Sequence, residues 1–224
     1  MLNGHGDDGA GDAPIGLLGR FVEAYRRPRV SARRILFAQP SGNEALLMVV
    51  ASYFITTALL HAAQMAAPDF FGAVRQGLED AIREAGGEPG PPPGLLEQMA
   101  FGILLTLLMF WVGSSLAWFV GVQAGGKSTR RQIMGVVAWH ALATTPLSVV
   151  VQIAMAASSL DKQDPVPVLL YVGGGLYGFY MFAAFIAEAH GFRKTGLVMM
   201  ACFGVAFVIA LALGLIVGLL TPPS

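Results

Sequence analysis

The chain has 224 residues, of which 55% are hydrophobic and 12% charged, and its formal net charge is zero. A soluble domain carries about 25% charged residues, so this composition excludes an ordinary water-soluble domain, and the balanced charge argues against a nucleic-acid partner. The single cysteine, Cys202, excludes an intrachain disulfide framework and gives no pair of metal ligands, so no cofactor or metal is predicted.

Residues 1–13 are rich in Gly and Asp and are predicted to form a disordered tail rather than a signal peptide. Residues 14–40 form a basic segment in which apolar residues recur at helical spacing, from Ile15 through Leu18 to Tyr25. This pattern predicts an amphipathic helix at the membrane interface. Near an anionic leaflet each basic residue contributes about 1 kcal/mol, so lipid or partner binding is predicted for Arg20, Arg26, Arg27, Arg29, Arg33 and Arg34. Alternatively, these arginines only set the topology.

Residues 41–224 contain five long stretches without Asp, Glu, Lys or Arg. A helix needs about 20 apolar residues to cross the hydrocarbon core. In lipid each backbone amide needs a partner within its own segment, so such stretches are expected to be helices. The sequence therefore predicts an all-α, five-helix transmembrane bundle, with spans near 45–67, 98–124, 132–158, 166–189 and 196–219.

The basic residues predict the orientation. Most of the 14 lie before the first span, after the second span and after the fourth span. The positive-inside rule places these segments in the cytosol, so the N-terminus is predicted inside and the C-terminus outside. The external loop 68–94 is the only long connection; it contains a possible amphipathic helix at 71–84 and ends in a run of Pro and Gly.

The segment from Gly121 to Ser128 fits the phosphate-binding pattern G-x-x-x-x-G-K-[ST]. That chemistry requires a preceding strand and an acidic Mg²⁺ partner in an α/β domain. Here the first glycine ends a predicted span, so the match is interpreted as a coincidence. The alternative is a tight glycine turn with basic topology markers, with Ser128 capping the next helix.

Ionisable residues near a membrane are a default functional hypothesis. His140 and Glu188 form a possible intramembrane polar site if the third and fourth spans pack with these faces together, while His61 and His190 lie near the span ends. The structural alternatives are a hydrogen bond from His140 to Thr144 or Thr145, and pairing of Glu188 with a nearby base such as Arg193 or Lys194. The sequence shows no credible nucleophile–base pair.

Small residues recur at four-residue spacing within the spans, which is typical of faces where helices pack closely within or between chains. Pro146 lies in the middle of the third span and is predicted to kink it. The candidate packing residues are Gly113, Gly121, Gly174, Gly178, Gly214 and Gly218.

Several motifs together resemble a known family. A basic lead that includes Arg27-Pro28-Arg29 precedes the spans, Gly125-Gly126-Lys127-Ser128 follows the second span, and Glu188-Ala189-His190-Gly191 ends the fourth. This pattern resembles the bacterial branch of the YIP family, over roughly residues 20–220. The resemblance implies a five-span bundle with a cytosolic N-terminal region. Eukaryotic members are linked to vesicle traffic, membrane shaping and binding of prenylated GTPases, a pathway that bacteria lack. The long Pro-rich loop departs from the shortest forms of the pattern.

The sequence thus predicts a non-enzymatic scaffold or accessory subunit in a bacterial inner membrane. Its expected partners are the lipid bilayer, anionic lipids in particular, and a membrane protein or a second copy of the chain. The alternative prediction is a small transporter or channel that uses His140 and Glu188.

Overall fold

The computed structural model describes residues 16–84, 86–88, 94–160 and 164–220, and the side chains of 95, 159, 160, 209, 210 and 212–220 lie outside this description. Every regular element in these ranges is a helix, which confirms the all-α prediction. The predicted tail 1–13 lies outside the described residues. The helices are α1 (Leu17–Arg26), α2 (Pro28–Ala38), α3 (Gly42–Ala66), α4 (Pro68–Glu84), α5 (Leu95–Gln123), α6 (Arg130–Ala143), α7 (Thr145–Leu160), α8 (Pro165–His190) and α9 (Thr195–Leu220).

Local sequence signals explain where these helices begin and end. Ser41 and Glu44 form a capping box at the start of α3, and Asp164 caps α8 by accepting a hydrogen bond from the amide of Val166. Such caps satisfy backbone N–H groups that have no partner within the helix. At the far end of α8, Gly191 takes a left-handed conformation with φ of 75°, which glycine adopts without the steric cost of a Cβ.

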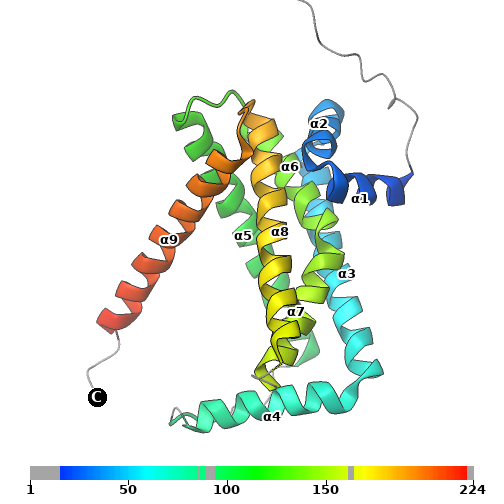
Figure 1. Ribbon diagram of the computed structural model, residues 1–224, viewed down its shortest axis with the longest axis vertical. Coiled ribbons are helices and arrows are strands. Elements are labelled where there is room, and N and C mark those ends of the chain that lie inside the picture. The colour runs from blue at the N-terminus through cyan, green and yellow to red at the C-terminus, as the bar shows by residue number, and fades with distance from the viewer. Residues whose placement is uncertain (1–15, 85, 89–93, 161–163, 221–224) are drawn as a thin grey trace, which may run out of the picture.

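The helices run between two ends of an elongated bundle (Figure 1). The long helices α3, α5 and α8 and the pair α6–α7 lie along the axis, and α9 leaves α8 at one end and leans away from the rest. The α5–α6 connection, the α8–α9 connection and the two short helices α1 and α2 lie at the same end. We call this the basic end, because the three basic segments of the sequence meet there.

The opposite end is covered by α4, which lies across the bundle axis (Figure 1). This helix confirms the prediction of a helix within the long loop. It carries both charged and apolar residues, and none of its side chains is buried. It is therefore oriented as an interfacial helix would be.

Pro146 kinks the bundle as predicted. Helix α6 ends at Ala143, α7 begins at Thr145, and the two helix axes are bent by 55°. Proline has no N–H to continue the hydrogen-bond ladder and its ring clashes with the preceding turn. The Thr144 and Thr145 hydroxyls donate to the carbonyls of His140 and Ala141, so the broken turn is stabilised by side chains.

Helices α3, α5 and α8 are each long and apolar enough to cross a membrane, and the bent α6–α7 pair makes a fourth candidate if it is counted as one span. Helix α9 is apolar over Thr195–Val208. Large apolar side chains on these helices face outward, for example Leu104 and Leu169. Such outward faces are expected where hydrocarbon is the solvent.

Candidate functional site

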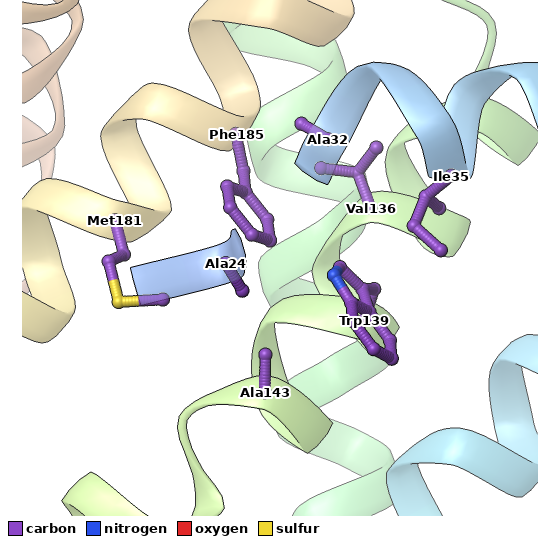
Figure 2. Packing of buried hydrophobic residues seen from close by; sticks show 8 residues of the cluster. All are labelled: Ala24, Ala32, Ile35, Val136, Trp139, Ala143, Met181 and Phe185. Carbon is purple, nitrogen blue, oxygen red and sulfur yellow. The ribbon is translucent and has the colours of Figure 1, made fainter. Parts of the chain in front are cut away.

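The N-terminal helices α1 and α2 are packed onto the bundle at its basic end. Ala24 of α1 and Ala32 of α2 are fully buried against Phe185 of α8. Their small side chains allow close approach, and Figure 2 shows Phe185 and Met181 from α8 beside them. Close packing of this kind gives each contact its dispersion energy. The complete buried cluster is Ala24, Ala32, Ile35, Val136, Trp139, Ala143, Met181 and Phe185.

Hydrogen bonds between distant segments fix this packing. The Trp139 indole Nε1 donates to Ser31 Oγ at 2.8 Å, and both residues are buried. The Tyr177 hydroxyl of α8 donates to the Tyr25 carbonyl of α1. Burial also raises the pKa of the Tyr25 phenol above its ordinary value. Arg131 of α6 donates to the Gln39 and Pro40 carbonyls, which follow α2.

Glu188 joins the N-terminal helices to the end of α8. Arg29 Nε lies 2.8 Å from one carboxylate oxygen and Arg33 Nε 2.9 Å from the other. The Glu188 side chain is only 13% exposed, against 35% for Arg29 and 71% for Arg33. Arg29 also donates to the Phe192 and Arg193 carbonyls at 2.7 and 3.0 Å. The guanidinium fork of Arg29 thus holds the carboxylate and the chain reversal together.

His190 fills a space left by two glycines. A Cβ at Gly121 would lie 2.0 Å from His190 Nε2, and a Cβ at Gly126 would lie 2.2 Å from Nδ1. The imidazole is 3% exposed, and its Nδ1 lies 2.8 Å from Ser128 Oγ. The Lys127 amide donates to the His190 carbonyl at 3.4 Å. The turn after α5 and the end of α8 are therefore locked together by one ring.

This arrangement corrects the expectation that Ser128 caps the next helix, and it agrees with the interpretation of the G-x-x-x-x-G-K-[ST] match as a coincidence. Ser128 does not cap α6; Thr129 does, in a capping box with Gln132, because the Ser128 hydroxyl is used by His190. The backbone positions that would approach a phosphate in a nucleotide-binding loop are occupied by imidazole, and Gly121 lies within helix α5. The described residues contain no strand to precede such a loop.

The Ser128–His190 pair was missed in the sequence because the two residues are far apart along the chain. A hydroxyl–imidazole pair can act as nucleophile and base when a third group orients the base. Here both side chains are buried, and the second ring nitrogen lies 3.3 Å from the Ala117 carbonyl rather than a carboxylate. A substrate would have no path to the hydroxyl, so the geometry favours a packing role.

The six predicted arginines divide into two groups. Arg29 and Arg33 bind Glu188, and Arg34 Nε lies 2.9 Å from Glu23 of α1. The other three are exposed, and no ion pair to them is found among the described residues. They are available for lipid or a partner, and we call them the free arginines: Arg20, Arg26 and Arg27.

The structure does not bring His140 and Glu188 together. His140 Nε2 lies 3.1 Å from the Gly178 carbonyl of α8, and its ring contacts Phe182 and Phe185 edge-on. Glu188 is ten residues further along the same helix, about 15 Å at 1.5 Å per residue. Each group thus has its own partners.

His61 is exposed, and the described residues hold no cluster of three or more His, Cys, Asp or Glu able to bind a metal.

The predicted small faces have different neighbours. A Cβ at Gly174 would lie 2.6 Å from Val151, so α7 and α8 pack closely there, and Gly178 faces Leu147 of the same helix α7. Gly113 has no atom within 4 Å of its Cβ position. The side-chain surroundings of Gly214 and Gly218 lie outside the described residues.

Together, the apolar helices, the transverse helix α4 and the closely packed basic end are those of a polytopic α-helical membrane protein. The family profile described as Yip1 domain matches residues 22–216. The chain belongs to the Yip1-domain family. The match begins within α1 and includes both sets of contacts described above, the ion pair of Arg29 with Glu188 and the packing of His190 against Gly121. Neither the curated proteins nor the solved structures contain a match to this chain.

Proposed function

We propose that this protein is a non-enzymatic scaffold or accessory subunit of a bacterial inner membrane, belonging to the bacterial branch of its family. The observation that carries the proposal is that most polar groups at the basic end are paired with one another, whereas the free arginines are exposed. Polar groups that could do chemistry there are engaged with one another. The free arginines, in contrast, lie on α1 or at its end, and this helix also carries exposed apolar residues such as Leu18 at 79% exposure. A surface with cations and exposed apolar side chains suits contact with a lipid interface or a membrane-protein partner.

The proposal includes five spans with the basic end in the cytosol. In this arrangement α9 is the fifth span, because it extends over 26 residues to Leu220 and about 20 suffice to cross. The bent α6–α7 pair counts as one span, so α4 lies on the external face. The distribution of basic residues supports this orientation through the positive-inside rule.

Cysteine labelling tests this topology. In a Cys202→Ser background, single cysteines are introduced at Lys127, which is exposed on the α5–α6 turn, and at Gly77, which is exposed on α4. In intact right-side-out vesicles a membrane-impermeant maleimide is expected to label Gly77→Cys at once and Lys127→Cys only after permeabilisation. Labelling of both sites from one side would contradict the proposed orientation.

The scaffold role is tested by photocrosslinking in the native membrane. A photoactivatable residue at Leu18, which is exposed on the same helix as Arg20 and Arg26, is expected to give a discrete adduct with a second protein or a second copy. Arg20→Gln/Arg26→Gln/Arg27→Gln should reduce that adduct severalfold, because it removes charge without disturbing the Arg29–Glu188 contact. The same probe at Leu108, 50% exposed on α5, serves as the control for unspecific contact with lipid-facing helices. A chain that runs alone in mild detergent and yields no adduct from Leu18 would rule out the scaffold role.

A further inference from the structure

A cavity of about 620 Å³ lies between α5, α8 and α9. This volume falls within the roughly 300–1,000 Å³ of typical small-molecule sites. Its described walls are almost entirely apolar: Leu116 and Val120 come from α5, Phe182 from α8, and Val205 from α9. The cavity is partly open rather than enclosed, and hydrocarbon is what such walls would bind.

The end of the cavity nearest the basic end is chemically different. Arg193 and Lys194 line it there, and both are exposed. No acidic side chain in the described part of the chain forms an ion pair with either. Helix α9 begins at the next residue, Thr195, with no acidic residue in its first turn. The positive end of this helix therefore adds to the two cationic side chains.

We propose that this cavity is a binding site for one anionic glycerophospholipid. An acyl chain occupies the apolar trough between α5 and α9, and the phosphate lies at Arg193, Lys194 and the first N–H groups of α9. A second helix or a second copy would fill the trough but would leave the two cations uncompensated. An anionic amphiphile matches both ends of the site.

The site is adjacent to the buried imidazole of His190, which packs against Gly121 and Gly126. Gly121 and Phe192 line the cavity, and the Phe192 ring stacks on the His190 imidazole with 5.4 Å between ring centroids. A bound acyl chain would cover the outer side of this stack. The inference goes beyond the scaffold role and does not depend on it, since the free arginines of α1 take no part in the cavity.

The test uses the full chain reconstituted in phosphatidylcholine vesicles. The probes are phosphatidylglycerol and phosphatidylcholine with identical acyl chains that carry a diazirine, and the adducts are mapped by peptide mass spectrometry. Phosphatidylglycerol is expected to label Leu197–Ala206 about tenfold more than phosphatidylcholine. Both lipids carry a phosphate, but the choline ammonium of phosphatidylcholine cancels its charge, so only phosphatidylglycerol brings a net negative headgroup to the two cations. Arg193→Gln/Lys194→Gln should bring the two lipids to the same level, whereas Arg20→Gln/Arg26→Gln, with the same change in net charge, should leave the preference intact.

Substitutions that fill the cavity provide a second arm. Ala201→Phe places a ring in the trough and should reduce phosphatidylglycerol adducts severalfold, whereas Met200→Phe, at a neighbouring residue that is 71% exposed and outside the cavity, should not. Equal labelling by the two lipids in the native chain would overturn the proposal. So would a preference that survives Arg193→Gln/Lys194→Gln. Each of these results leaves the α1 crosslinking test of the scaffold role unaffected.

Discussion

Gly121→Ala is expected to destabilise the protein by about 3 kcal/mol, near the upper end of the cost of overpacking. The added methyl would lie 2.0 Å from Nε2 of a buried imidazole, so the ring of His190 must move. Movement of the ring breaks its contact with Ser128, which is buried as well. Thermal unfolding in detergent, followed by circular dichroism, measures the loss.

A double-mutant cycle separates this steric effect from a general cost of substitution. His190→Ala removes the ring and should be destabilising alone, but Gly121→Ala should cost less than about 1 kcal/mol in that background, giving a coupling of about 2 kcal/mol. Gly126→Ala should be rescued less well, because its Cβ would also lie 2.7 Å from the Gly121 carbonyl. Gly113→Ala, on the same helix with nothing within 4 Å, is the matched control. Additive effects of Gly121→Ala and His190→Ala would show that the ring is not the obstacle.

Arg29→Ala is expected to release the N-terminal helices from the bundle. The substitution removes one of the two ion pairs of a carboxylate that is only 13% exposed, together with two hydrogen bonds to the Phe192 and Arg193 carbonyls. Hydrogen bonds to charged groups contribute about 1.5–3 kcal/mol, and part of this is lost to solvent screening at a half-exposed arginine. We expect a net cost of about 2 kcal/mol.

Arg33→Ala provides the comparison, because it meets the other oxygen of the same carboxylate but is 71% exposed. Its loss should cost less than about 1 kcal/mol. Limited trypsin digestion reports the docking directly: cleavage after Arg26 should accelerate in Arg29→Ala and change little in Arg33→Ala. The bond after Arg27 is not a trypsin site, because Pro28 follows it. Arg29→Lys should restore only part of the protection, since an ammonium cannot serve the carboxylate and two carbonyls as the planar fork does. Equal proteolysis of both alanine variants would contradict the central role assigned to Arg29.

The helices themselves could be predicted from the sequence because a hydrocarbon solvent allows few backbone conformations. The charge-free stretches coincide with α3, α5, α6–α7, α8 and α9 to within a few residues, since an apolar chain in lipid must satisfy its own amides. The break at Pro146 was equally accessible, because proline removes a hydrogen bond when it lies in the interior of a helix.

The site could not be predicted because its contacts join residues that are remote in sequence. Glu188 was expected to pair with Arg193 or Lys194, its nearest bases, yet it pairs with Arg29 and Arg33 more than 150 residues away. His140 was expected to bond a threonine one turn along, yet it bonds the Gly178 carbonyl. Local spacing gives no information about which faces of two spans meet. The Glu188-Ala189-His190 sequence places two ionisable residues at the end of α8, but it does not indicate which residues they contact.

The N-terminal helices are synthesised first, but some of their packing partners are synthesised much later. The carboxylate that holds Arg29 is separated from it by 159 residues, and Phe185, which buries Ala24 and Ala32, belongs to the same late helix. Helix α6 is synthesised earlier and already supplies Trp139 as a hydrogen-bond partner for Ser31. The ion pair of Arg29 and the packing against Phe185 can form only once α8 has been made, so the docking of α1 and α2 is completed late in the synthesis of the chain.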